Sequence, residues 1–167
     1  MREALLRFRR CQEMALPATL DGGDVLQLGR RLFVGRTART NEAGIAALRA
    51  AVAPFAYEVV PIVVTGCLHL KSAVTALDEE TLLAILGAFD EAPFAGCELV
   101  PVPSEEREAA NVLQVRGEVW IPAGFPRTLD RLDGRGYRVV PMDVSEFLKA
   151  EAGLTCKSVL FRRNGPG

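Results

Sequence analysis

The sequence is poor in the side chains that build metal centres and disulfide frameworks. Its 167 residues include one histidine, His69, and four widely separated cysteines with no CxxC pair. One histidine and scattered cysteines lack the spacing of zinc ligands. Because no export signal is recognisable, we interpret the cysteines as reduced thiols. We therefore expect no metal site and a cytoplasmic location.

Long apolar runs and an excess of basic residues are also missing. No apolar stretch approaches the roughly 20 residues that a membrane-spanning helix needs. The N-terminal residues Met1–Arg10 are charged and amphipathic, unlike a signal peptide. The net charge of -1 and the pI near 5.9 do not provide the basic patch of a nucleic-acid-binding protein. The sequence thus predicts neither a membrane nor a nucleic-acid partner.

What the sequence does contain is a repeat. The pairs Val60-Pro61, Val100-Pro101 and Val140-Pro141 are spaced forty residues apart. Each is predicted to close a strand that follows a hairpin and a helical segment. A fixed period of this kind is typical of repeated supersecondary units. Units of two or three strands with a helix, packed around a centre, predict an α/β propeller-like fold. We expect one domain over residues 1–167.

The apolar pattern and the turn residues predict the elements of each repeat. Either Thr40 or Asn41 is expected to cap the first long helix, which Pro54 stops. The charged run Ser104–Glu108 is interpreted as a solvated helix start. The predicted hairpins cover 25–34, 73–86 and 111–121; the strands cover 57–64, 98–102 and 137–140; the helices cover 2–14, 41–53, 127–132 and 144–150, with a weak helical piece at 88–92.

Cys156 is the first candidate for chemistry. It lies in the stretch Glu151–Ser158, just before the apolar run Val159–Phe161, which is predicted as a strand. A thiol at a strand edge beside a loop can be presented to a cleft, as a nucleophile must be. A lone cysteine at such a junction is more often a small buried hydrophobic residue, so the position alone decides nothing.

Three segments stand out from the repeat: Asp21-Gly-Gly-Asp24, Leu68-His-Leu-Lys-Ser72 and Leu154-Thr-Cys-Lys-Ser158. Together they supply a carboxylate, an imidazole and a thiol. That set is sufficient for nucleophilic catalysis, in which the imidazole moves protons and the carboxylate holds it. On spacing alone the two aspartates are equally turn formers, and His69 is equally a core histidine.

These segments, with Leu32-Phe-Val-Gly35 and Arg39-Thr-Asn41, resemble the motifs of dimethylarginine dimethylaminohydrolases. That family belongs to the guanidino-group-modifying superfamily, with arginine deiminase and glycine amidinotransferase. The resemblance covers residues 20–160, with the motifs in the family's order. It implies a pentein fold, a pseudo-fivefold α/β propeller of ββαβ-type units, of which three are recognisable here. Residues 1–19 are then a helix and lead-in.

The resemblance also implies the roles of individual residues. Cys156 matches the nucleophile, His69 the proton carrier and Asp21 the carboxylate that orients the histidine. Arg39 matches an arginine that binds the substrate's α-carboxylate, for which a planar two-pronged donor is suited.

Three further assignments concern the substrate side of the site. Glu151 stands where the family carries an acid, an aspartate, that contacts the guanidinium; its longer side chain leaves that contact open. Asp24 is first a turn-stabilising hydrogen bonder and second a substrate contact. Ser72, which ends the His-Leu-Lys-Ser motif, is assigned to substrate binding.

The activity implied by the resemblance is hydrolysis of an Nω-methylated arginine, such as dimethylarginine, to citrulline and dimethylamine. The reaction passes through a covalent thiouronium on cysteine and needs no metal or organic cofactor. An arginine deiminase-like hydrolase is an alternative, disfavoured because Lys71 stands where that family has an acid.

A second alternative is an inactive fragment that serves as a binding or assembly module. Three of five units would leave a flank of the core exposed. We therefore expect poor solubility, a homo-oligomer, or a partner that supplies the missing N-terminal units.

Overall fold

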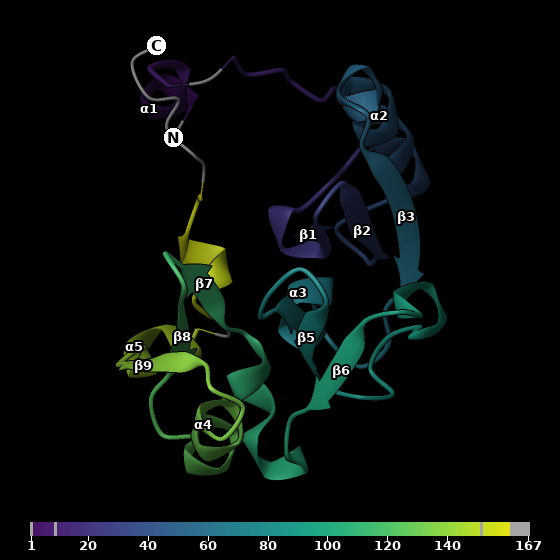
Figure 1. The fold of residues 1–167 in the computed structure, drawn as a ribbon. Helices are drawn as coiled ribbons and strands as arrows, with labels where there is room; N and C mark the ends of the chain where they lie inside the picture. The colour runs from purple at the N-terminus through teal and green to yellow at the C-terminus, as the bar shows by residue number, and fades with distance from the viewer. Residues whose placement is uncertain (1, 9, 151, 161–167) are drawn as a thin grey trace.

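Three small sheets, each of three strands, follow one another around an arc (Figure 1). The computed structural model describes residues 2–8, 10–150 and 152–160. In every sheet the first two strands are antiparallel and the second and third are parallel. Helical segments connect the parallel strands, so each unit is of the predicted ββαβ type. The forty-residue period therefore corresponds to a structural repeat, and the predicted fold class is confirmed.

The strands lie close to their predicted positions. They are β1 (Val25–Leu28), β2 (Arg31–Arg36) and β3 (Glu58–Val63) in the first unit; β4 (Val74–Ala76), β5 (Thr81–Ala84) and β6 (Glu98–Pro101) in the second; and β7 (Leu113–Val115), β8 (Glu118–Pro122) and β9 (Arg138–Met142) in the third.

The helical segments are of two kinds, short α-helices and 3-10 turns. The α-helices are α1 (Arg2–Leu6), α2 (Glu42–Val52), α3 (Leu70–Ala73), α4 (Pro126–Asp133) and α5 (Ser145–Leu148); the 3-10 turns are η1 (Gly22–Asp24), η2 (Ala53–Phe55), η3 (Ala92–Phe94), η4 (Ser104–Ala110) and η5 (Thr155–Lys157). Within the described ranges, no helix is long and apolar enough to cross a membrane.

The repeated prolines lie in the third strand of each sheet. Pro61 pairs with Val34 and Pro141 with Ile121, and their strands continue to Val63 and Met142. The prediction that each proline closes its strand is thus wrong for β3 and β9. The third strand is an edge strand in each sheet, where a residue without an N–H group costs no ladder hydrogen bond.

The core is continuous across the units. Phe33 of β2 stacks on Phe94 of the second unit, with ring centroids 4.3 Å apart. A second apolar cluster joins the second and third units and includes Leu83, Val119 and Leu132. The units therefore stabilise one another through shared side chains.

Two helices are shorter than predicted, and two other expectations about local structure are wrong. The N-terminal helix ends at Leu6 instead of residue 14, since a short helix has little stability of its own. Residues 88–90 form no helix, because their backbone bonds to residues 63–65. The helix predicted at 144–150 covers only Ser145–Leu148. Val159 and Leu160 form no strand, since no strand pairs with them among the described residues; Phe161 lies outside these.

The charged run Ser104–Glu108 begins the 3-10 helix η4 and is exposed, as predicted, except at Glu106. Glu106 is only 5% exposed. Its carboxylate accepts hydrogen bonds from the N–H groups of Arg127 and Thr128 and from the Thr128 hydroxyl, at 2.7 to 3.0 Å. It therefore caps the N-terminus of α4, where a negative charge is stabilising.

The shared core makes a testable prediction. Replacing Phe94, which is 1% exposed, in Phe94→Ala should lower the free energy of unfolding by about 3–5 kcal/mol. The matched control is Phe55→Ala in the corresponding turn of the first unit, where the ring is 63% exposed and the change should be within about 0.5 kcal/mol. Urea unfolding measures both; equal losses would contradict a core shared between units.

Candidate active site

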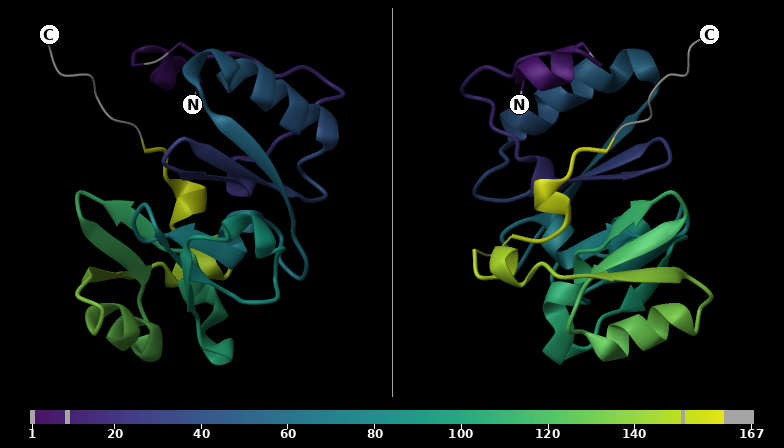
Figure 2. Two further views of the ribbon diagram at one scale, coloured as in Figure 1. Left: turned by 45° about the vertical axis from the view of Figure 1, so that its right-hand side comes forward. Right: turned by 90° about the vertical axis from the view of Figure 1, so that its left-hand side faces the viewer.

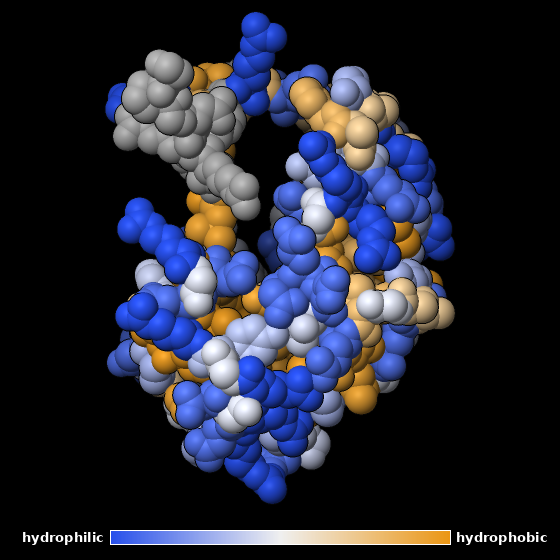
Figure 3. Space-filling view, in the orientation of Figure 1, coloured by the Kyte–Doolittle hydropathy of each residue, from blue (hydrophilic) through white to orange (hydrophobic). Residues whose placement is uncertain are grey.

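The three sequence segments singled out as chemical candidates line one cavity. The cavity has a volume of about 920 Å³, and Asp21, His69 and Cys156 all lie on its wall. The η1 and η5 turns are in contact. Figure 2 shows the C-terminal segment passing between the first unit and the other two, and Figure 3 shows the molecule hollowed at the centre of the arc. The fold thus gathers a carboxylate, an imidazole and a thiol that are far apart in sequence.

The Asp-Gly-Gly-Asp motif forms the 3-10 turn η1. One carboxylate oxygen of Asp21, Oδ1, accepts a 2.8 Å hydrogen bond from the Gly23 N–H group and so caps the turn. The His69 ring lies against Gly23: a Cβ atom there would be 2.8 Å from His69 Cγ. The second glycine of the motif is therefore required by its close approach to the histidine.

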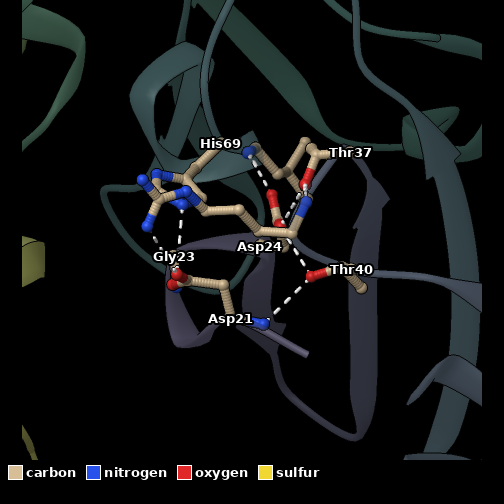
Figure 4. Close-up of polar contacts among 8 residues, drawn as sticks. Asp21, Gly23, Asp24, Thr37, Thr40 and His69 are labelled. Atoms are coloured by element: carbon tan, nitrogen blue, oxygen red, sulfur yellow. Dashed lines mark hydrogen bonds and ion pairs between the residues drawn. The ribbon is translucent and has the colours of Figure 1, made fainter. Parts of the chain in front are cut away.

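The other oxygen of Asp21 faces the His69 imidazole (Figure 4) and the Arg39 guanidinium. Its Oδ2 lies 3.3 Å from His69 Nε2 and 3.9 Å from a guanidinium nitrogen of Arg39. His69 Nε2 is buried and makes no hydrogen bond of good geometry with any described residue. The Gly23 N–H bond lowers the pKa of Asp21; partial burial opposes this, and the His69 and Arg39 charges add to it.

Asp24, the second acid of the motif, is fully buried. Its carboxylate accepts hydrogen bonds from the Thr37 hydroxyl at 2.7 Å, the Thr40 hydroxyl at 2.6 Å and the Leu70 N–H group at 3.0 Å. These donors come from the loop after β2 and from the residue that follows His69. The position fits the expected hydrogen-bonding role, and no part of Asp24 is exposed for a substrate to touch.

Thr40 is a residue whose role the sequence did not reveal. Asn41, the other candidate cap, caps α2 by accepting from the Gly44 N–H group at 2.8 Å. Thr40 instead accepts a 3.0 Å hydrogen bond from the Asp21 N–H group while donating to Asp24. It therefore links both acids of the motif. The only signal in the sequence was a threonine directly before a helix cap.

His69 and Lys71 reach the cavity from the start of α3. His69 is 8% exposed and immediately precedes the helix. Burial lowers the pKa of the Lys71 ammonium, while the nearby Cys156, Asp21 and Asp24 raise it and so oppose the shift. Lys71 lies on the same cavity wall as Cys156. Ser72 is half-buried and is not among the residues that line this cavity.

Cys156 is exposed in the 3-10 turn η5, not at the edge of a strand as expected. The turn is closed by the Ser158 hydroxyl, which donates to the Leu154 carbonyl at 2.8 Å. Asn111 holds Thr155 from the other side, with two hydrogen bonds of 2.9 Å. Glu151, the acid predicted to contact the guanidinium, lies outside the described residues. In the described parts of the chain, no group of three or more His, Cys, Asp or Glu side chains is placed to hold a metal ion.

Known proteins resemble this chain in sequence. The chain is 43% identical over 146 residues to N(G),N(G)-dimethylarginine dimethylaminohydrolase of Streptomyces coelicolor, covering 87% of this chain and 56% of the relative. It is 33% identical over 162 residues to the protein of the same name from Pseudomonas aeruginosa, covering 95% and 63%. The chain thus spans less than two thirds of either relative. No family model matches the sequence.

Solved structures agree with the fold. The chain superposes with a TM-score of 0.80 and 31% identity on a cysteine-to-serine mutant of the Pseudomonas aeruginosa enzyme complexed with citrulline, covering 85% of this chain and 56% of that one. Inosamine-phosphate amidinotransferase from Streptomyces griseus gives a TM-score of 0.78 at 19% identity, covering 91% and 49%. The second likeness concerns the fold alone.

The contact between Gly23 and the His69 ring can be tested with two neighbouring glycines. In Gly23→Ala the new methyl group displaces the ring, which should lower stability by about 1–3 kcal/mol and shift the imidazole signals of the chain's only histidine. Gly22→Ala is the matched control, because a Cβ there has no atom within 4 Å. Urea unfolding and NMR measure both effects. Identical spectra for the two variants would contradict the contact.

The lowered pKa of Asp21 makes stability depend on pH. Its folded-state pKa lies below the unfolded value of about 3.9, so the ionised group stabilises the fold above that pH. The contribution is lost as the pH falls through the folded value. Asp21→Asn keeps an oxygen for Gly23 and should cost up to about 1 kcal/mol at pH 7, less as pH drops below 4. Urea unfolding at pH 7 and pH 3 tests this; an unchanged difference would contradict it.

Proposed function

Because the chain belongs by sequence and fold to the dimethylarginine dimethylaminohydrolase family, we propose that its cavity hydrolyses a methylated arginine to citrulline and an alkylamine. The observation that carries the proposal is the common cavity of Cys156, His69 and Asp21, with Asp21 Oδ2 3.3 Å from His69 Nε2. A thiol, a proton carrier and an orienting carboxylate are the set that covalent catalysis on a guanidinium requires.

In the first step the Cys156 thiolate attacks the guanidinium carbon of dimethylarginine. His69, protonated at the start, gives its proton to the departing dimethylamine as the C–N bond breaks. A positively charged thiouronium remains on the cysteine. The Asp21 carboxylate stabilises the imidazolium beforehand, as an opposite charge at this distance does.

In the second step neutral His69 takes a proton from water, and the resulting hydroxide attacks the same carbon. As the C–S bond breaks, the added oxygen loses its remaining proton to solvent, and citrulline and the thiolate are released. A free thiol has a pKa near 8.5, so the thiolate needs help at neutral pH. A cationic guanidinium bound beside Cys156 favours the thiolate, and a protonated Lys71 on the same cavity wall adds to this effect.

The remaining contacts divide between binding and support. Arg39 is exposed at the cavity and is free to pair with the substrate's α-carboxylate through its two-pronged guanidinium. We assign Asp24 a supporting role, because it is wholly buried and hydrogen-bonded. Glu151 stays a proposed guanidinium contact, and Ser72 stays a proposed substrate-side residue without a position on the cavity wall.

The relatives are longer than this chain, so part of the binding site is proposed to come from elsewhere. The chain spans 56% and 63% of the two enzymes it matches. We propose that further propeller units, in a longer polypeptide or a partner, supply the acids that grip the guanidinium. The cytoplasmic location stays a prediction.

The direct test is citrulline release from asymmetric dimethylarginine, assayed with this chain and with the polypeptide that its complete gene encodes. Cys156→Ser should abolish release, as expected for loss of a nucleophile. Cys97→Ser, a half-buried thiol packed against the core, should leave it within about twofold.

Three results would separate the alternatives. Preference for unmethylated arginine would favour a deiminase. Citrulline from the full product alone would mean that this chain is an incomplete half-site. No citrulline from either preparation would contradict the proposed function and favour a binding or assembly module.

A further inference from the structure

A buried amide connects the two segments that carry the cysteine and the histidine. Asn111 lies between η4 and β7 and is 7% exposed. Its Nδ2 donates to the Lys71 carbonyl and to the Thr155 hydroxyl, both at 2.9 Å. Its Oδ1 accepts from the Thr155 N–H group, also at 2.9 Å. Lys71 is two residues from His69, and Thr155 is the neighbour of Cys156.

The chemistry of these partners requires an asparagine. The amide gives both of its hydrogens and one oxygen lone pair, which is most of what an asparagine side chain has. Turning the amide over would set its NH₂ group against the Thr155 N–H group and its oxygen against the Lys71 carbonyl. Aspartate lacks the two donors, and an apolar residue of similar size would leave three partly buried polar groups without these partners.

The backbone around Asn111 is itself anchored in the core. The Thr75 hydroxyl of β4 donates to the Ala110 carbonyl at 2.5 Å and accepts from the Val112 N–H group at 3.3 Å. Thr75 is 2% exposed. Thr75 thus fixes the backbone of the residues before and after Asn111. The position of Asn111 is therefore set by the core, and the cysteine segment packs against it.

Gly153 shows how closely the cysteine segment fits this amide. A Cβ atom at Gly153 would lie 2.5 Å from both Cγ and Oδ1 of Asn111. The segment therefore passes Asn111 at a distance that no side chain would allow. The close approach of Gly153 to Asn111 is a second observation, separate from the three hydrogen bonds. It too indicates that the cysteine segment packs directly against the Asn111 side chain.

We propose that Asn111 is a positioning residue that fixes the turn carrying Cys156 against the segment carrying His69. The role rests on the proposed function only in calling Cys156 the nucleophile; the docking of the turn is a property of the fold. Asn111 is not among the residues that line the cavity, so it acts through Thr155 and Lys71. Displacement of a reacting group by about 1 Å costs on the order of 100-fold in rate, so this docking matters for chemistry.

The first measurement needs no activity. Asn111→Ala should increase hydrogen exchange at the Thr155 amide by at least about tenfold, while the core strand β2 stays protected. The rate at which iodoacetamide alkylates Cys156, followed by mass spectrometry, should approach that of an unstructured cysteine peptide. Gly153→Ala, which moves the turn with Asn111 intact, should do the same.

The matched control is Glu106→Gln. Glu106 is equally buried and hydrogen-bonded, but its hydrogen bonds go to the start of α4 and to neither segment of the site. It should lower overall stability while leaving exchange at the Thr155 amide and the alkylation rate of Cys156 unchanged. If it loosens Cys156 as much as Asn111→Ala does, the role of Asn111 is general stability and the proposal is overturned.

Kinetics in a preparation that releases citrulline complete the test. Asn111→Ala should lower kcat by about 10- to 100-fold with KM changed less than about threefold, because binding contacts are left in place. A turn that loosens without loss of kcat, or a Thr155 amide that stays protected, would overturn the proposal. A loosened turn in a chain that hydrolyses nothing would contradict the proposed function and leave the docking role intact.

Discussion

The arrangement of this site depends on one buried carboxylate, that of Asp24. A carboxylate removed from water is stable only when donors replace the lost hydration. Here the donors are two threonine hydroxyls from the loop after β2 and the Leu70 N–H group beside His69. Meeting this requirement brings the Asp-Gly-Gly-Asp turn, the loop that carries Arg39 and the histidine into one place.

A second buried polar group, Asn111, makes the corresponding connection for the thiol. The acid and the histidine are thus fixed by Asp24, and the cysteine turn is fixed by Asn111. Both groups lie where neighbouring units meet, while the apolar clusters behind them hold the units together. The repeated units therefore form the scaffold, and the candidate catalytic residues lie on the loops and turns where neighbouring units meet.

The fold was largely predictable because its signals are local. Alternating apolar residues and glycine turns define the hairpins, and the forty-residue period defines the units. Arg116 and Gly117 both adopt positive φ at the β7–β8 turn, as an Arg-Gly pair between two short strands suggests. The short helices were less predictable, because backbone pairing, as at residues 88–90, overrides a weak helical pattern.

The site was predictable in its members but not in its supports. Asp21, His69 and Cys156 lie in motifs that can be recognised in sequence, and the structure places them on one cavity. Asn111 forms hydrogen bonds with Lys71, 40 positions before it, and with Thr155, 44 positions after it. No local sequence pattern predicts contacts over such separations. The burial of Glu106 is hidden for the same reason: its partners, Arg127 and Thr128, begin a helix 21 residues later.

We propose that the Cys156 sulfur forms the covalent bond to the substrate's guanidinium carbon in this cavity. Acid quenching of the reaction with asymmetric dimethylarginine, followed by peptide mass spectrometry, tests it most directly. The account predicts a thiouronium adduct on the peptide that contains Cys156 and none on those containing Cys67 or Cys97. Citrulline release accompanied by an adduct on another residue, or by no adduct under conditions that slow the second step, would contradict it.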